Sequence, residues 1–474
     1  MIELTLGQIS QLVSGRVFAS ASEADQMAAV AITGSVETDS RLVAPGALFV
    51  AKPGEVTDGH NYLQAAKDAG AAAAIVEREV TSVDLPQIVV ADSVLALGQL
   101  AKGVLAMVRA ETGLKVIGIT GSNGKTTTKN MLRAILSRAG ETVAPIESYN
   151  NEVGAPISVL KIDFKTKFLV AELGAGGPGS IGYLADITRP DIAVELKVGM
   201  AHAGEFGGID ATAEIKAELL DYLPADAVAV LNADDGYIRA MVDGRELNSI
   251  WFGTDSDADY RAASHQLSIS GTGFELRWPD GETQWVNLQI LGEHHVMNAL
   301  AAIAVADQLA VPRAEIIAAI EALPLAERWR MQVLPAANGI TVINDAYNAS
   351  PDSTKAALQT LAQLGRSTGR RTVAIIGEMA ELGEFSRREH DAIGRLCVRL
   401  NLGLTIAVGS GAHLVYMGAT QEGSFSGEAQ YFESVAEALA GVREMLIAGD
   451  IVLVKSSKSA NLRHLGDALA EVNA

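Results

Sequence analysis

Short apolar runs alternate with polar or glycine-rich turns and with amphipathic stretches along most of the chain. The runs Ala47–Ala51, Leu114–Ile119 and Phe168–Ala171 each have the length and composition of a buried strand. A turn and then a helix-like pattern follow each run. This repeated order of strand, turn and helix predicts an α/β fold with a largely parallel sheet.

The pattern separates into three blocks, which agrees with the domain number that a length of 474 residues favours. Residues 1–100 predict a small N-terminal α/β domain, and residues 101–322 predict a central parallel-sheet domain. Residues 323–474 predict a doubly wound, Rossmann-like domain, because four apolar runs alternate with four helical stretches. These runs are 339–344, 372–377, 404–408 and 451–455, and the helical stretches are 352–364, 387–401, 433–447 and 460–471.

Local signals predict where several elements begin or turn. Thr5 and Gln8 have the spacing of a capping box ahead of a short helix at Leu6–Val13. Alternating residues around Pro279–Gly281 predict a β-hairpin within the central block. A long alanine-rich helix is expected to begin around His295.

Composition and charge narrow the class of protein. The formal net charge is −20 and no basic run occurs, which argues against binding to a nucleic-acid backbone and mildly favours a soluble monomer. The single cysteine, Cys397, cannot form an internal disulfide and is expected to be a small packing residue. The first residues do not show the basic segment and apolar segment of a secretory signal. No uncharged apolar run reaches membrane-spanning length. We therefore expect a cytoplasmic protein without membrane insertion.

The stretch GITGSNGKTTTKNML, residues 118–132, predicts a phosphate-binding loop between a strand and a helix. Glycines let the backbone N–H groups point at a phosphate, and the helix N-terminus adds a favourable dipole. Lys125 can reach the terminal phosphates, and the Thr126 hydroxyl can ligate Mg²⁺. The usual first glycine falls on Ile119, so the alternative is a glycine turn with a surface lysine. The order of elements favours ATP-type binding by Thr120, Gly121, Ser122, Asn123, Gly124, Lys125, Thr126 and Thr127.

Three further residues are candidates for the chemistry near this loop. Glu172 ends a predicted strand, where ligands of open α/β sheets bind, so it is expected to hold Mg²⁺. His202 follows another strand and is a candidate on the metal side, while Lys216 lies in a predicted helix. The alternatives are a solvated glutamate, a hydrogen-bonded structural histidine and a solvated lysine.

Several longer strings resemble the ATP-dependent Mur ligase family across essentially the whole chain. They are TDSRLVAPGALFVA with DGHNYLQAA (38–66), NNEVGAP (150–156), ELGAGGPGSIGYL (172–184), NDAYNASPDSTKAAL (344–358) and GEMAELGEFSRREH (377–390). The last string is the most discriminating, because the phosphate loop is also shared with folylpolyglutamate synthetases. The resemblance implies a ligase that uses ATP and Mg²⁺ to add D-alanyl-D-alanine to UDP-N-acetylmuramoyl-tripeptide through an acyl phosphate.

The resemblance also implies roles for residues that match the family's motifs. Thr126, Glu172 and His202 would lie at the metal, and Lys216 matches a lysine that is carbamylated in relatives. Asn298 would lie beside adenine. In the third block, Arg330 and Asp345 would reach the nucleotide, and Arg330 would join the catalytic set of Lys125, Glu172, His202 and Lys216.

The substrate ends are implied in the same way. The uridine end would be held by Ser40, Arg41, Thr57, Asp58, Gly59 and His60. Asn151 and its neighbour Glu152 would lie near the phosphates, without an assignment of which one contacts them. The acyl end or the incoming dipeptide would be held by Tyr347, Asn348, Lys455, Ser457 and Lys458.

The chain departs from the family pattern at a few positions. His295 stands in place of an asparagine, Gly204 in place of a glutamate, and Ser350 in place of another asparagine. Near the C-terminus, Ser456 and Lys458 replace a glycine and an arginine. Exchanging arginine for lysine removes a two-pronged hydrogen-bond donor, which leaves a carboxylate-binding role for Lys458 open.

Two other functions remain as alternatives at this point. Another amide ligase of the same family would add a different amino acid to a different acceptor. A regulatory phosphate-loop switch would bind nucleotide without catalysis, although no guanine-reading Asn-Lys-x-Asp is evident at a strand end. The set Glu172, His202 and Lys216 would be superfluous in such a switch.

Overall fold

The computed structural model describes residues 1–18, 24–54, 57–145, 148–201, 203–255, 257–324, 328–422 and 427–470. The chain is α/β, as expected, and it forms two compact units. The first comprises Met1–Ile119, Ala139–Ala193 and Glu218–Ala227, and the second comprises Thr120–Arg138, Val194–Ala217 and Val228–Ala474. The first unit thus contains Glu172, while the second contains the phosphate loop and the C-terminal sheet.

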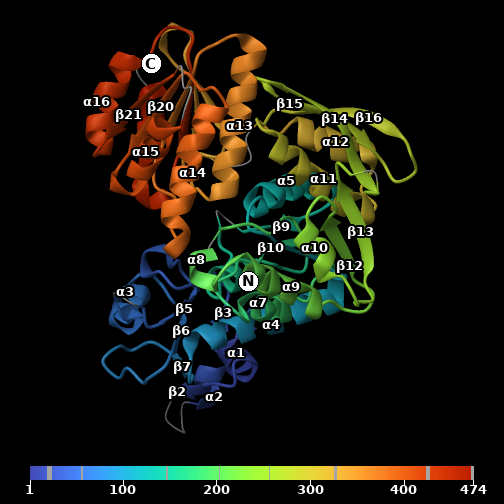
Figure 1. Cartoon of the computed structure of the whole chain (residues 1–474). Coiled ribbons are helices and arrows are strands. Elements are labelled where there is room, and N and C mark those ends of the chain that lie inside the picture. Colours follow the sequence, from blue (N-terminus) through green and yellow to red (C-terminus); the bar gives the residue numbers. More distant parts are fainter. Residues whose placement is uncertain are drawn as a thin grey trace. The chain divides into compact units, whose positions relative to one another are not determined.

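The N-terminal part of the first unit is built on a five-stranded sheet (blue in Figure 1). The strand order is β2 (Arg16–Phe18), β7 (Gln87–Val89), β6 (Ala73–Val76), β5 (Leu48–Val50) and β4 (Val36–Glu37). All neighbours are parallel except β2, which pairs antiparallel with β7. The predicted capping box is present: the Thr5 side chain and the Gln8 side chain cap α1 (Leu6–Leu12) reciprocally.

The rest of the first unit places Glu172 at the end of a parallel strand. β10 (Phe168–Glu172) lies between β8 (Lys115–Thr120) and β9 (Thr142–Val143), and Glu172 is level with Ile119. The helix α4 (Ser93–Thr112) packs against α6 (Gly154–Val159) and α7 (Ser180–Thr188). Among the described residues, α4 is the one helix long and apolar enough to cross a membrane, but half of its apolar window is buried inside the protein.

In the second unit, α5 (Lys125–Ala139) follows the phosphate loop directly. The strands β12 (Val228–Asn232), β13 (Asn248–Gly253) and β14 (Tyr260–Ser268) run parallel. β15 (Gly271–Arg277) and β16 (Thr283–Leu288) then continue antiparallel, which confirms the predicted hairpin. The alanine-rich helix α11 (Glu293–Gln308) begins two residues before His295 and packs on these strands.

The C-terminal sheet has the order β17 (Gln332–Pro335), β18 (Thr341–Asp345), β22 (Ile451–Lys455), β19 (Thr372–Ile376), β20 (Leu404–Val408) and β21 (Glu428–Phe432). The four predicted strands are parallel, and the sheet is covered on both faces (Figure 1). One face carries α13 (Pro351–Thr368), α14 (Ser386–Arg399) and α15 (His413–Gln421), and the other carries α16 (Val435–Met445) and α17 (Leu462–Ala470). The predicted doubly wound domain is therefore confirmed.

Two strands and one helix of this C-terminal domain were not predicted. The edge strands β17 and β21 are only partly buried, so neither shows the continuous apolar run of a central strand. The nine-residue helix α15 has few buried residues of its own.

Cys397 is fully buried in α14, and burial raises the pKa of its thiol to about 12, which supports the expectation of a packing residue.

The described part contains three further strands and six further α-helices. The strands β1 (Leu4–Thr5), β3 (Ala31–Ile32) and β11 (Ile192–Glu195) and the helices α2 (Ala24–Ala28), α3 (Leu63–Asp68), α8 (Ala203–Phe206), α9 (Ile209–Asp221), α10 (Gly236–Met241) and α12 (Arg313–Glu321) complete the described part. α9 carries Lys216, which the sequence predicted to lie in a helix.

The contact between α14 and α15 depends on a glycine. A Cβ atom on Gly394 would lie 2.0 Å from the carbonyl oxygen of Val415. Gly394→Ala should therefore lower the free energy of unfolding by about 1–3 kcal/mol, although alanine favours helices, because backbone atoms cannot give way like a side chain. Denaturant unfolding measures the change. Gly236→Ala at the start of α10, where the space is open, is the control and should be neutral or slightly stabilising because alanine favours helices. Equal stability of the two variants would contradict the account.

Candidate active site

The phosphate loop is held in shape by backbone hydrogen bonds to the segment that follows β11. Leu196 N donates to Thr120 O over 3.1 Å, and Ser122 N donates to Lys197 O over 2.7 Å. Gly121 and Gly124 have φ values of 150° and 90°, in the region that favours glycine. The loop is therefore preorganised, with its curl fixed before a ligand arrives.

Cations and a hydroxyl gather at this loop. The Lys125 ammonium donates to Gly121 O over 2.7 Å, so it lies on the loop itself. Thr126 is buried, and Arg330 lies 3.4 Å from its hydroxyl oxygen. The Arg330 guanidinium is 4.4 Å and the Lys458 ammonium 5.4 Å from the centroid of the Tyr347 ring. The predicted residues of the second and third blocks thus meet within one compact unit, and their charge suits a polyphosphate.

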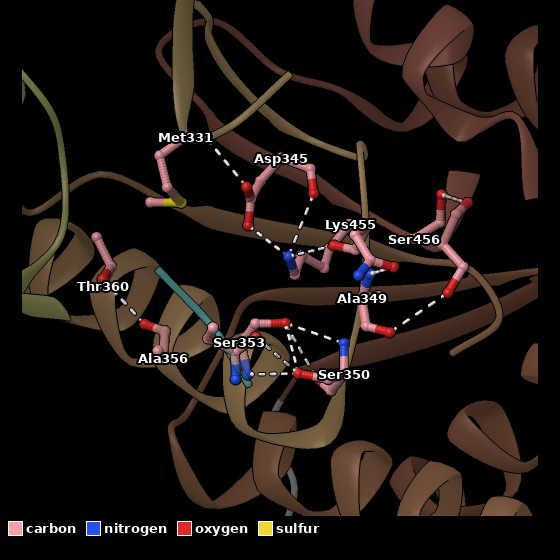
Figure 2. Close-up of polar contacts among 12 residues, drawn as sticks. Met331, Asp345, Ala349, Ser350, Ser353, Ala356, Thr360, Lys455 and Ser456 are labelled. Atoms are coloured by element: carbon pink, nitrogen blue, oxygen red, sulfur yellow. Dashed lines mark hydrogen bonds and ion pairs between the residues drawn. The ribbon is translucent and has the colours of Figure 1, made fainter. Parts of the chain in front are cut away.

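Asp345 and Lys455 form a buried ion pair at the carboxyl ends of β18 and β22 (Figure 2). The Lys455 ammonium lies 2.7 Å from Asp345 Oδ2 and also donates to Asn348 O over 2.7 Å. Met331 N donates to Asp345 Oδ1 over 3.0 Å. Two residues predicted to touch ligands therefore bind each other, and through Asn348 O the pair also holds the segment that follows β18.

Ser457 is similarly engaged with its neighbours. Its hydroxyl accepts from Ala380 N over 2.8 Å and donates to Ala349 O over 3.3 Å. Lys458, one residue later, is exposed. Of the residues predicted to bind the dipeptide, Lys458 is the one with an exposed charge, because Lys455 is buried in its ion pair.

A cavity of about 340 Å³ opens beside the phosphate loop. Its lining includes Asn123 and Gly124 at one end and Asp234, His294 and Asn298 elsewhere. A Cβ on Gly124 would lie 2.3 Å from Asn298 Oδ1, so the predicted adenine-side residue directly abuts the loop. The cavity has the size and position to hold a nucleoside whose phosphates lie on the loop.

His294 lines this cavity, and the ring of His295 packs against the ring of His294. The rings of His294 and His295 are 4.1 Å apart, and His295 Nδ1 lies 3.3 Å from Asn298 Nδ2. Burial lowers the pKa of His294 to about 4 and holds the pKa of His295 well below its usual value. Both rings are therefore uncharged at neutral pH, and the replacement of asparagine by His295 adds no cation.

Lys216 is buried rather than solvated, and Glu195 is a functional candidate that the sequence analysis missed. Glu195 ends β11, is fully buried, and neither of its carboxylate oxygens has a hydrogen-bond partner in the described part of the chain. Burial raises its pKa to about 8, against the opposing charge of Lys216. Burial, and then the charge of Lys125, lowers the pKa of Lys216 to about 7. The sequence feature that could have identified Glu195 is an acidic residue at the end of an apolar strand.

In the first unit, Glu172 is buried at the end of β10. Asn150 Nδ2 donates to Glu172 Oε1 over 2.9 Å, whereas the Asn151 side chain accepts from Gly154 N over 2.8 Å and so holds the start of α6. Of the two neighbouring asparagines, the one that the sequence analysis did not single out contacts the carboxylate. His202 lies outside the described residues.

The predicted uridine-end residues divide into two groups. Ser40, Arg41, Thr57 and Gly59 line a cavity of about 500 Å³ in the first unit. Asp58 and His60 instead brace the adjoining turn, because Asp58 Oδ1 is 2.6 Å from His60 Nδ1, and His60 Nε2 accepts from Glu77 N over 2.9 Å.

Two departures from the family pattern have local structural reasons. A Cβ on Gly204 would lie 2.3 Å from the carbonyl carbon of Leu382, so the close backbone approach requires glycine there. Ser350 caps the start of α13 and donates to Asn123 Oδ1 over 3.2 Å. Asp352, in the first turn of α13, accepts from Met200 N over 2.8 Å. These contacts tie α13 to the phosphate-loop region.

Comparison with known families gives three matches along the chain. The model described as "Mur ligase family, catalytic domain" matches residues 33–104. "Mur ligase middle domain" matches residues 119–306, and "Mur ligase, glutamate ligase domain" matches residues 329–458.

Curated proteins and solved structures are similar over the full length. The UDP-N-acetylmuramoyl-tripeptide–D-alanyl-D-alanine ligases of Mycobacterium tuberculosis H37Rv and Escherichia coli K12 are 42% and 31% identical, covering 99% of this chain and 98% and 99% of theirs. A crystal structure of MurF from Acinetobacter baumannii has a TM-score of 0.89 at 33% identity, with 99% of both chains covered. MurF from Thermotoga maritima in complex with ADP has a TM-score of 0.81 at 27% identity, covering 93% of this chain and 98% of that one.

Glu195 makes the stability of the protein depend on pH. The unfolded chain releases the Glu195 proton above pH 4.5, whereas the folded chain keeps it until about pH 8, so rising pH in this window favours unfolding. Glutamine cannot ionise, so the gain in Tm of Glu195→Gln over the wild type should grow from pH 4.5 to pH 7. Calorimetry measures it, with the surface variant Glu141→Gln as control. A Tm difference that is constant with pH would refute the assignment.

Proposed function

The chain belongs to the Mur ligase family, and we propose that it is the ATP-dependent, ADP-forming ligase that joins D-alanyl-D-alanine to UDP-N-acetylmuramoyl-tripeptide. Its product is the UDP-muramoyl-pentapeptide precursor of peptidoglycan. The observation that carries this conclusion is full-length similarity to ligases of that name. The preorganised phosphate loop and the neighbouring nucleoside-sized cavity support it physically.

The reaction proceeds in two displacement steps. The terminal carboxylate of the tripeptide attacks the γ-phosphorus of ATP, the bond to the β-phosphate oxygen breaks, and ADP and an acyl phosphate form. The amine of D-alanyl-D-alanine then attacks the acyl carbon, loses a proton, and expels phosphate to leave an amide. Both steps bring anions together, so fixed cations and N–H donors dominate the catalysis.

Residues around the phosphate loop supply these charges in our proposal. The loop N–H groups and Lys125 bind the phosphates, and Arg330 stabilises the transferring phosphoryl group from beside Thr126. Asn298 and the neutral His294, which both line the cavity, face the adenine. In this proposal the ion pair with Lys455 holds Asp345 in the nucleotide site. Lys455 thereby stabilises the strand ends instead of binding a substrate carboxylate.

A magnesium ion completes this proposal. The Thr126 hydroxyl and the Glu172 carboxylate are hard oxygen donors of the kind that Mg²⁺ prefers, and both are buried. His202 is proposed on the metal side from the family motif alone. When bound, Mg²⁺ would neutralise charge on the phosphates. Asn150 orients Glu172 for this role through the hydrogen bond to Oε1.

We also propose that Lys216 is carbamylated. The reaction needs a neutral amine, and burial lowers the pKa of Lys216 to about 7, so a substantial neutral fraction exists at physiological pH. The amine nitrogen bonds to the carbon of CO₂ and releases one proton. The resulting carbamate would carry a negative charge in the field of Lys125, whose charge already lowers the pKa of Lys216.

The proposed division of labour follows the three blocks. Residues 1–100 bind the UDP end of the substrate, residues 101–322 bind ATP, and residues 323–474 supply Arg330 and hold the dipeptide near Tyr347, Asn348, Ser457 and Lys458. Lys458 provides an exposed charge for the dipeptide. We also propose a cytoplasmic monomer that is not inserted into a membrane, because the net charge of −20 favours a soluble monomer and half of the apolar window of α4 is buried.

The first experiment measures phosphate release from ATP by the purified protein. The mixture contains Mg²⁺, UDP-N-acetylmuramoyl-tripeptide and D-alanyl-D-alanine, and each component is omitted in turn. Release should require all of them, and a product with the mass of the UDP-muramoyl-pentapeptide should appear. Release with an L-amino acid instead of the dipeptide would point to another amide ligase, and no release would contradict the proposed reaction.

Lys125→Ala tests the phosphate-loop assignment. Removing one fixed cation from the transferring phosphoryl group should raise the barrier by about 3 kcal/mol, which lowers kcat roughly a hundredfold. The matched control is Lys102→Ala, which removes a surface lysine paired with Asp186 and should retain full activity. A Lys125→Ala enzyme with more than about a tenth of the wild-type rate would contradict the role.

A further inference from the structure

Two cavities of the first unit share part of their lining. The uridine-end cavity described above contains Ser40 and Tyr62. A second cavity, of about 390 Å³, is lined mainly by the segment from Ser148 to Gly154. Only Thr38 and Lys52 line both cavities among the residues that the structure describes. These two residues therefore mark the passage from one cavity to the other.

The two cavities have different linings, which suit different parts of one extended substrate. The first offers the half-exposed ring of Tyr62, whose hydroxyl is 3.1 Å from Thr57 Oγ1, together with the hydroxyl of Ser40. Flat aromatic and hydroxyl groups suit a nucleoside. The second contains Asn150, which hydrogen-bonds the catalytic carboxylate Glu172. A nucleotide-linked sugar would thus place its nucleoside in the first cavity and its reactive arm in the second.

The diphosphate of such a substrate falls at the passage, where Lys52 provides a charge. Lys52 is half-buried, and its ammonium has no ion pair or hydrogen bond within the described ranges. The other cation of the first cavity, Arg41, is already bound to Asp39 at 2.5 Å, and its side chain is 86% exposed. Lys52 is consequently the cation at this passage that remains available for an anion.

The backbone holds Lys52 in place. Lys52 N donates to Val50 O over 3.0 Å, and Lys52 O accepts from Gly59 N over 2.9 Å. The residue directly follows β5, so its main chain is fixed at the end of a central strand while its side chain spans the two cavities. An anchored backbone reduces the entropy that is lost when the ammonium binds a ligand.

We propose that Lys52 binds the diphosphate of the UDP-linked substrate and so fixes how far that substrate extends toward Glu172. This assignment rests on the proposed function, which supplies the UDP-linked substrate. Lys52 is a substrate-positioning residue, and it acts on the nucleotide-linked substrate alone.

Steady-state kinetics of the whole enzyme give the first test. Lys52→Met removes the ammonium and keeps the apolar stem, so the KM for the UDP-linked tripeptide should rise roughly ten- to hundredfold. The KM values for ATP and for D-alanyl-D-alanine should not change. Lys52→Arg should recover most of the loss because it restores the charge. Lys67→Met, at a surface lysine paired with Asp84 and outside both cavities, is the matched control.

Competitive inhibition by UDP and by uridine separates the diphosphate from other anions. Lys52→Met should weaken inhibition by UDP roughly tenfold or more and leave inhibition by uridine within about twofold. A raised KM with unchanged inhibition by UDP would assign Lys52 to a carboxylate of the peptide and overturn the proposal. Equal losses for UDP and uridine would overturn it too, because they would indicate a damaged nucleoside cavity.

The outcomes also distinguish this inference from the proposed function. A wild-type enzyme that turns over the UDP-linked tripeptide, with Lys52→Met showing an unchanged KM, would refute the Lys52 assignment alone. A wild-type enzyme that releases no phosphate with that substrate would refute the proposed function and the inference with it. Thermal unfolding of each variant shows whether a loss reflects misfolding, and the Lys52→Arg variant keeps the test decisive in that case.

Discussion

The hydrogen bonds that join the phosphate loop to the segment after β11 are the constraint on which the second unit depends. Thr120 and Ser122 bond the backbone of Leu196 and Lys197, and the Ser122 hydroxyl both accepts from Gly199 N and donates to Gly199 O. A loop that binds polyphosphate must keep several N–H groups converging without an anion to hold them. Bonding the loop to a neighbouring strand end supplies that order, and it also brings Glu195 into the same buried region as Lys125 and Lys216.

The same region concentrates charge that the protein offsets in different ways. Lys455 is neutralised by Asp345, whereas Lys216 loses part of its charge because burial disfavours the ammonium. Lys125 and Arg330 lie at the loop itself, where Lys125 donates to Gly121 O and Arg330 donates to the Thr126 hydroxyl. A polyphosphate bound at this loop would therefore meet Lys125 and Arg330, and the buried ion pair with Asp345 keeps the charge of Lys455 from adding to theirs.

Local sequence patterns predicted most of the fold because strands, caps and turns depend on nearby residues. The capping box at Thr5 and Gln8 and the four parallel C-terminal strands were predictable for this reason. Edge strands such as β17 were not, since partial burial leaves no continuous apolar run. At the site, polar strand ends were found correctly, but their partners depend on packing between distant segments. Lys455 resembles a ligand-binding lysine in sequence and binds Asp345 in the structure, and Asn150 rather than Asn151 contacts Glu172.

The burial of Cys397 has a practical consequence for following this enzyme at work. The chain contains one thiol, which is fully buried in α14 and remains protonated at neutral pH because its pKa is about 12. Maleimide dyes react with accessible thiolates, so the folded native chain presents almost no background labelling. One cysteine introduced on the surface of each compact unit would then accept a donor and an acceptor fluorophore, and energy transfer would measure the distance between the two labels during a single turnover.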